Sequence, residues 1–226
     1  LKMKELIQVH GAIMDGYDPE KRIGMIIDEW GTWYDVEPGT NPGFLYQQNT
    51  MRDALVAGIN LNLFNKNCDR VKMANIAQMV NVLQAVILTE GGKMVKTPTW
   101  HAFNLYKYHQ DGELVESDLK TKEAGVEEKY MIPALSESVS AGKDGKLHVT
   151  LTNASLTDSA DIEAIFAETS VKSVKASILT GDMKAHNTFE TPDQVHSTEF
   201  TAVTVNGNKV SFNAPACSVL HLEVEI

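Results

Sequence analysis

Residues 26–34 have the sequence IIDEWGTWY, and this stretch decides how the rest of the chain is interpreted. The apolar run of residues 23–27 does not alternate with polar residues, which is typical of a strand buried on both faces of a parallel sheet. Asp28 and Glu29 follow where such a strand ends, and the catalytic side chains of a (β/α) barrel project from the carboxyl ends of its strands. Glu29 with two tryptophans close behind it therefore indicates a sugar site, in which a carboxylate acts as nucleophile and aromatic rings stack on the sugar. The alternative is that a single acid at a strand end caps a helix or pairs with a cation.

The chain around this stretch alternates between helical and extended patterns up to about residue 112. Residues 31–45 are interrupted repeatedly by Pro and Gly, which predicts a long loop, and long ordered loops often carry function. Pro98 directly after Thr97 indicates the start of a helix. The expected elements are helices at residues 1–17, 46–64 and 76–88 and from residue 98, with strands at residues 23–27 and 71–74. This order is typical of an α/β fold.

Beyond residue 112 the pattern changes to the two-residue alternation of β-strands. Apolar and polar residues alternate at residues 147–152, 162–166 and 220–226. The triplet Asn206-Gly207-Asn208 between two valine-rich runs predicts a hairpin. Several short strands separated by turn residues are typical of an antiparallel β-sandwich. We therefore expect an α/β domain at residues 1–112 and an all-β domain at residues 113–226.

The charge of the chain argues against two classes of partner. The 226 residues carry a net charge of −10, and the two halves differ: residues 1–112 hold 11 basic and 12 acidic residues, whereas residues 113–226 hold 9 and 18. An acidic chain without a basic stripe is a poor candidate for binding nucleic acid or an anionic membrane. The sequence contains no run of about 18 consecutive apolar residues, so no membrane span is predicted.

The remaining reactive residues predict no further chemistry. Cys68 and Cys217 are the only cysteines, which excludes a disulfide framework, and we expect both thiols to be buried. The seven histidines have no metal-ligand spacing, so no metal site is expected. Met73 and Met79 are expected to pack in the core, and the acidic run at residues 123–128 to face solvent. Gly91-Gly92-Lys93 lacks the flanking residues of a phosphate-binding loop and is expected to form a turn.

Several blocks of the chain, taken in order, resemble glycoside hydrolase family 51, the α-L-arabinofuranosidases. The first is the stretch at residues 26–34, and the later ones are RDAL at residues 52–55, DRVKMANIAQMVNV at residues 69–82 and TPTW at residues 97–100. The resemblance covers residues 1 to about 110 well, and the β-rich half resembles the family's C-terminal sandwich in placement and pattern.

The resemblance implies a retaining hydrolase built on a (β/α)8 barrel with a jelly-roll-like β-sandwich appended. It implies that Glu29 is the nucleophile, that Gln78 contacts the sugar and that Trp33 lies near the leaving group. The substrates it implies are terminal arabinofuranosyl residues of arabinan- or arabinoxylan-type polysaccharides. No cofactor is expected, because this hydrolysis needs only two carboxyl groups and correct positioning.

One feature of the family is absent from the sequence. The family's acid/base glutamate follows an asparagine, and the chain contains no Asn-Glu dipeptide. Its α/β half is also shorter than the roughly 250 residues of a whole barrel, and Leu1 lies within a helical pattern. We therefore expect this chain to be a C-terminal portion that holds the last barrel strands and is inactive alone. Its expected partners are the N-terminal remainder of the barrel and, in a homo-oligomeric complete enzyme, further copies.

Two other functions are also compatible with the sequence. In the first, the sandwich is a carbohydrate-binding or structural module and the α/β half is an inert barrel remnant. Residues 131–226 supply only four aromatic rings of the Phe, Tyr and Trp types, all of them Phe, which is a poor platform for stacking sugars. The second is an endoglucanase, since some relatives cleave glucose-type linkages. The sequence does not define the compartment, which stays unknown.

Overall fold

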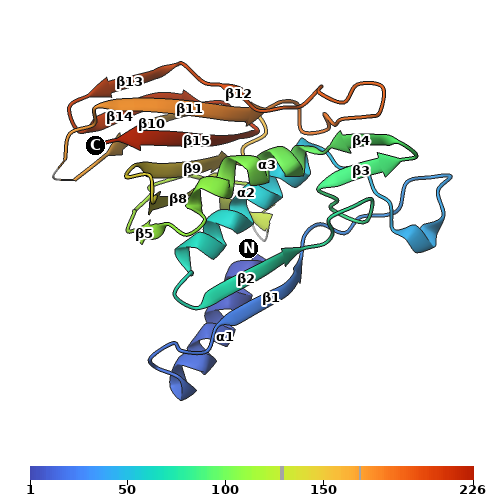
Figure 1. Cartoon of the computed structure of the whole chain (residues 1–226), viewed down its shortest axis with the longest axis horizontal. Helices are drawn as coiled ribbons and strands as arrows, with labels where there is room; N and C mark the ends of the chain where they lie inside the picture. Colours follow the sequence, from blue (N-terminus) through green and yellow to red (C-terminus); the bar gives the residue numbers. More distant parts are fainter. Residues whose placement is uncertain (128–129, 168) are drawn as a thin grey trace.

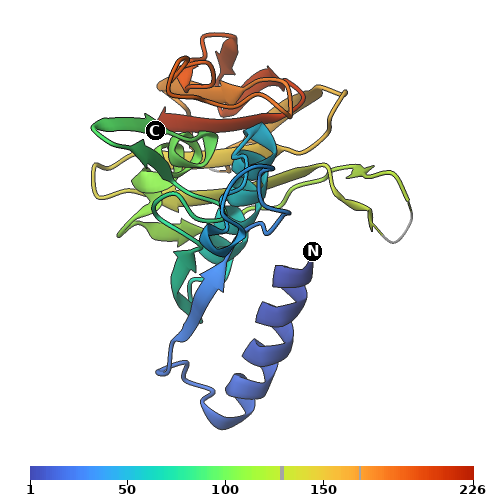
Figure 2. The ribbon, with the colours of Figure 1, turned by 90° about the vertical axis from the view of Figure 1, so that its right-hand side faces the viewer.

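The computed structural model describes residues 1–127, 130–167 and 169–226. Helices α2 and α3 lie between a parallel strand pair, β1 and β2, and a β-sandwich (Figure 1). Helix α1 lies at the end of the molecule away from the sandwich (Figure 2). The helices are α1 (Lys2–Tyr17), α2 (Met51–Lys66) and α3 (Pro98–Tyr106), with 3-10 turns η1 (Pro42–Phe44) and η2 (Lys107–His109).

Two strands lie near the acidic motif, as predicted, but the first spans residues 25–30 rather than 23–27. Asp28 and Glu29 therefore lie within this strand, and the prediction that it is buried on both faces is wrong. Strand β1 (Met25–Trp30) pairs in parallel with β2 (Val71–Ile76). Both strands pack one face on the helices, where the Trp30 ring contacts Phe64 and Phe103. The opposite face is exposed and includes Ile26 and Met73. The prediction that Met73 packs in the core is therefore wrong, because its side chain lies on the face of the pair that the helices do not cover.

Helix α2 begins at Met51, five residues later than predicted. The Asp53 carboxylate accepts a hydrogen bond from the Thr50 backbone N–H (2.8 Å), as in a capping box, and this satisfies a donor at the helix start. Helix α3 begins as predicted, with Thr97 as N-cap and Pro98 in the first turn.

The predicted helix at residues 76–88 is wrong. Residues 77–86 form an irregular segment, followed by a hairpin of β3 (Ile87–Glu90) and β4 (Lys93–Lys96) whose turn includes Gly91 and Gly92, as expected. Asn81 and Leu83 have positive φ angles, 60° and 50°, which interrupt a right-handed helix. Met79 lies in this segment and is exposed, so it too is not a core residue.

The β-sandwich is confirmed. A six-stranded sheet has the order β12-β11-β15-β9-β8-β5 and a three-stranded sheet the order β10-β14-β13, with a separate hairpin of β6 and β7. Its strands are β5 (Glu113–Val115), β6 (Glu123–Ala124), β7 (Ile132–Pro133), β8 (Leu135–Ala141), β9 (Leu147–Asn153), β10 (Ala160–Ile165), β11 (Ser173–Thr180), β12 (Thr198–Glu199), β13 (Val203–Asn206), β14 (Lys209–Ala214) and β15 (Ser218–Glu225). The predicted hairpin around Gly207 joins β13 to β14. Of the acidic run, Glu123 and Glu127 are exposed, and residue 128 lies outside the described residues.

The six-stranded sheet is buried on both faces. Leu220 and Leu222 of β15 face the core between the sheets, whereas the intervening His221 belongs to a polar face that packs against the helix layer. A second core combines side chains of α2 and α3 with Leu179 and Val219 of the sandwich. The two halves of the chain therefore share this second core, which fixes the helices, and through them β1 and β2, on the sandwich.

Cys217 is buried as predicted, but Cys68 is exposed because it lies in the turn between α2 and β2. Among the described residues, no group of His, Cys, Asp and Glu side chains could hold a metal ion.

None of the helices described here has the length and apolar character needed to cross a bilayer.

Candidate functional site

The carboxyl ends of β1 and β2 lie side by side. Trp30 is in register with Ile76, and the Ala77 N–H donates to the Trp30 carbonyl (2.8 Å). Because parallel strands end at the same sheet edge, Glu29 and Gln78 emerge at one place. The structure thus places two of the three residues predicted for the site near neighbouring strand ends.

Glu29 is exposed beside the buried Trp30. Its neighbour Asp28 accepts a long hydrogen bond from the Asn75 amide across the strand pair (3.4 Å). The Glu29 carboxylate has no hydrogen bond or ion pair with any other described residue. Glu29 is therefore the acid at this edge whose oxygen atoms are free to meet a ligand.

Gln78 is held through its backbone. Its N–H donates to the Val82 carbonyl and its carbonyl accepts from the Val86 N–H, both at 3.2 Å, while the side chain is exposed. Trp33 lies in the loop that follows β1 and is 67% exposed. No hydrogen bond joins the side chains of Glu29, Gln78 and Trp33 within the described residues. All three side chains are exposed.

The loop after β1 and the segment after β2 approach each other closely at Gly31. Its φ angle is +145°, and a Cβ there would lie 3.3 Å from both the Ala77 carbonyl oxygen and Gln84 Oε1. Glycine is the residue that tolerates this backbone angle and this approach. The two segments that carry the predicted site residues are therefore in direct contact.

A buried polar network, which was not predicted from the sequence, supports the loop. The Thr32 hydroxyl donates to Asp53 Oδ1 (2.7 Å), and the Thr32 N–H donates to Gln84 Oε1 (2.9 Å). Gln47 accepts from the Tyr34 N–H (2.8 Å) and donates to the Thr32 carbonyl (3.2 Å). The spacing of Thr50 and Asp53 was a capping signal in the sequence, but nothing in the local pattern distinguished the two glutamines from exposed ones.

Arg52 closes this network on its outer side. Its guanidinium lies 3.7 Å from the centre of the Tyr34 ring and donates to Asp53 Oδ2 (3.1 Å). Burial raises the pKa of Tyr34, so the phenol stays neutral beneath the cation at ordinary pH. The loop after β1 is thus attached to the start of α2 at several points.

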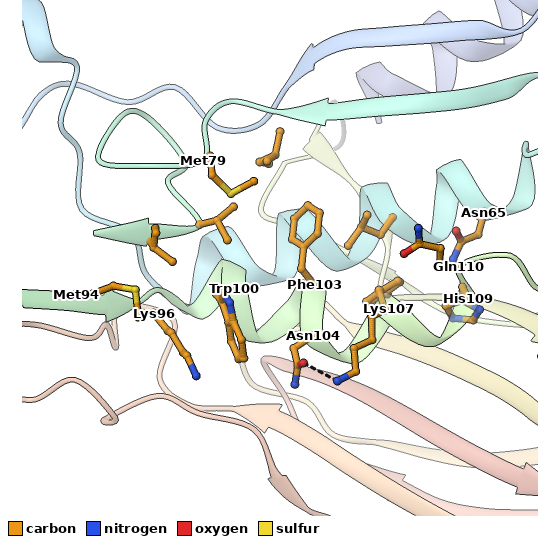
Figure 3. Close-up of a pocket in the computed structure, with 15 residues that line it drawn as sticks. Asn65, Met79, Met94, Lys96, Trp100, Phe103, Asn104, Lys107, His109 and Gln110 are labelled. Carbon is orange, nitrogen blue, oxygen red and sulfur yellow. Dashed lines mark hydrogen bonds between the residues drawn. The ribbon is translucent and has the colours of Figure 1, made fainter. Parts of the chain in front are cut away.

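A separate groove lies on the helix layer. It has a volume of about 730 Å³ and is lined by Met79, Met94, Trp100 and Phe103, among others (Figure 3). Lys96 lies over the Trp100 ring (4.1 Å from Nζ to the ring centre). Glu29, Gln78 and Trp33 do not line this groove, so it is adjacent to the predicted site through Met79 but is not part of it.

Similarity to known proteins shows the class of protein to which this fold belongs. A family model described as the α-L-arabinofuranosidase C-terminal domain matches residues 28–218. The crystal structure of a family 51 arabinofuranosidase from Xanthomonas axonopodis pv. citri superimposes with a TM-score of 0.95 at 44% identity, covering 99% of this chain and 45% of that one. A family 51 structure from Thermotoga petrophila, 24% identical with a TM-score of 0.82, covers 100% of this chain and 49% of that one and shares the fold. The fold is that of the C-terminal portion of a glycoside hydrolase.

The similar sequences define the family. An intracellular exo-α-L-arabinofuranosidase of Bacteroides ovatus is 42% identical over 226 residues, which are 100% of this chain and 44% of that protein. An exo-α-(1→6)-L-arabinofuranosidase of Bifidobacterium longum is 29% identical over 182 residues, 74% of this chain and 35% of that protein. The chain therefore belongs to the α-L-arabinofuranosidases of glycoside hydrolase family 51 and corresponds to their C-terminal portion. It spans less than half the length of these relatives.

Proposed function

We propose that this chain is the C-terminal portion of a retaining α-L-arabinofuranosidase and that Glu29 is the nucleophile of that enzyme. The observation that carries the proposal is the position of Glu29, exposed and unpaired within the described residues, at the carboxyl end of β1 and beside the segment that holds Gln78. A carboxylate in such a place can attack an anomeric carbon without first breaking an ion pair.

Residues 1–112 are proposed to be the last part of a (β/α)8 barrel and residues 113–226 its β-sandwich. The arrangement of β1 and β2 supports this, since one face of the pair is packed on helices and the other is exposed, as expected for an open section of a barrel. The pair also has no further strand on either edge among the described residues, and closure of a barrel removes such edges. The missing strands would come from the N-terminal remainder of the enzyme.

In the proposed reaction, Glu29 attacks the anomeric carbon and a glycosyl-enzyme ester forms as the bond to the leaving oxygen breaks. A second carboxylic acid, about 5–5.5 Å away, gives its proton to that oxygen and then takes a proton from the water that hydrolyses the ester. This acid/base is proposed to lie on the N-terminal remainder, because no Asn-Glu pair occurs in the chain. Gln78 contacts the sugar, and Trp33 lies toward the leaving group.

The substrates proposed are terminal arabinofuranosyl residues of arabinan- or arabinoxylan-type polysaccharides. The names of the similar proteins, which are exo-acting arabinofuranosidases, support this class of substrate. The complete enzyme is proposed to be a homo-oligomer. The sandwich is proposed to brace the barrel, which its shared core with α2 and α3 supports, rather than to bind polysaccharide.

The test is chemical rescue of Glu29→Ala in the complete enzyme. Removal of a catalytic nucleophile is expected to lower kcat on an aryl arabinofuranoside by roughly 10⁴–10⁶-fold. Added azide should restore turnover and yield an arabinosyl azide of inverted configuration, because it attacks from the face that the carboxylate occupied. Glu20→Ala removes an exposed glutamate of the turn between α1 and β1 and is expected to keep full activity. Turnover of Glu29→Ala equal to that of Glu20→Ala would disprove the role of Glu29.

A further inference from the structure

We propose that Gln84 is a positioning residue of this site, whose buried amide locks the loop that carries Trp33 onto the segment that carries Gln78. The effect on kinetics rests on the proposed function, whereas the effect on the loop does not. Gln84 is fully buried, at 0% exposure, and it lies in the irregular segment between β2 and β3.

The Gln84 amide connects three parts of the molecule. Its Oε1 accepts from the Thr32 N–H (2.9 Å) in the loop after β1. Its Nε2 donates to the Asp53 carbonyl (2.7 Å) in α2 and to the Thr99 hydroxyl (3.1 Å) in α3. The Gln84 N–H donates to the Ala77 carbonyl (2.9 Å), directly before Gln78. Gln84 therefore links the loop after β1 and the segment after β2 to helices α2 and α3, and fixes the distances between them.

The position requires an amide. A carboxylate would keep the acceptor for the Thr32 N–H, but it would face the Asp53 carbonyl without a proton to donate. The Asp53 carboxylate is itself buried nearby, on the Thr32 hydroxyl (2.7 Å), so a second buried charge would be repelled. An apolar side chain would leave the buried Thr32 N–H without its acceptor, which is costly in a protein interior.

The hydrogen bonds of Gln84 lie close to the proposed nucleophile, Glu29. Thr32 is three residues after Glu29 and directly precedes Trp33. At Gly31 the loop passes so close to Ala77 that an added Cβ would lie 3.3 Å from the Ala77 carbonyl oxygen. A shift of the loop would therefore move the aromatic ring and the carboxylate relative to Gln78. Misplacement of reacting groups by about 1 Å can cost roughly a hundredfold in rate.

The test compares two buried amides in the complete enzyme. Gln84→Glu alters the loop network, and Asn62→Asp makes the same chemical change in α2, where Asn62 is 1% exposed and bonds Ser136, Ser138 and Thr150 of the sandwich. Gln84→Met, which keeps length without charge, serves if Gln84→Glu does not fold. The measurements are kcat and KM on an aryl arabinofuranoside, and hydrogen exchange of residues 31–48.

Gln84→Glu is expected to lower kcat by about a hundredfold, to raise KM and to speed exchange at residues 31–48. Asn62→Asp is expected to leave KM and that exchange unchanged, because partial unfolding alone lowers the active fraction without changing KM. Equal effects of the two variants, or an unchanged loop in both Gln84 variants, would overturn the proposal. If the parent enzyme turns over no arabinofuranoside, the proposed function fails, and the exchange measurement still decides the role of Gln84.

Discussion

Glu29 owes its exposed position to its neighbours. Trp30 is drawn into the helix layer by Phe64 and Phe103, so the residue before it is left at the exposed edge of the pair. The register of β1 and β2 shifts between Ile27 and Trp30, which locally breaks the regular pairing at the two acids. The packing of Trp30 on the helices thus leaves Glu29 exposed near the end of β1.

At this scale a prediction concerns Gly31. In the 226-residue chain, Gly31→Ala is expected to cost about 1–3 kcal/mol, because a side chain at positive φ is strained and its Cβ meets two fixed oxygen atoms. Gly11→Ala, inside α1 with no atom within 4 Å of the added Cβ, is expected to gain about 0.5–1 kcal/mol. Urea unfolding midpoints should therefore fall on opposite sides of the parent. A Gly31→Ala midpoint at or above the parent value would contradict the close approach seen here.

The interface between η2 and the six-stranded sheet shows how elements of unlike character are joined. The Tyr108 ring stacks on His221 with 4.4 Å between ring centres, and His221 Nε2 lies 3.1 Å from His148 Nδ1. His109 bonds the hydroxyls of Ser140 (2.7 Å) and Thr150 (2.9 Å). Polar side chains on this face of the sheet are thus matched by polar side chains of the helix layer.

This interface predicts a loss of stability in acid. Burial, the largest cause, lowers the pKa of His221 to about 3 and of His109 to about 4. The unfolded chain, with histidine pKa values near 6.5, therefore binds more protons than the folded chain, and the free energy of unfolding falls as the pH drops from about 6.5 to about 4. His221→Gln should reduce this slope in urea unfolding of the 226-residue chain measured across that range. A slope identical to that of the parent would show that His221 takes no part in it.

At the scale of the whole molecule, the chain is well packed on one side and open on the other. The helices share a core with the sandwich, whereas the outer face of β1 and β2 is exposed with Ile26 and Met73 on it. Such a surface is costly in water and suits burial against further strands.

The isolated 226-residue chain is accordingly expected to lack arabinofuranosidase activity. General acid–base catalysis contributes about 10²–10⁴-fold, and in the proposed enzyme the acid/base and the rest of the sugar pocket would come from the N-terminal remainder. The measurement is turnover of an aryl arabinofuranoside by the chain alone and after co-expression with the N-terminal remainder. Activity of the chain alone at the level of the co-expressed enzyme would contradict this expectation.

Elements with local signals could be predicted from the amino-acid sequence. The apolar run before Asp28 marked β1, Pro98 marked the start of α3, and the alternation beyond residue 112 marked the sandwich, because periodicity and turn residues act over a few positions. The order of the quoted blocks was enough to identify the family.

Tertiary structure alone decided the features that depend on contacts between distant residues. Residues 77–86 read as a helix, but two left-handed residues and bonds back to Gln78 and Met79 hold them in an irregular form. Gln84 looked like any glutamine of that segment, and its importance comes from Thr32 and Asp53, which are 52 and 31 positions away. Partners so far apart leave no trace in a local pattern, so the strand that carries Glu29 was readable from the sequence and the network beside it was not.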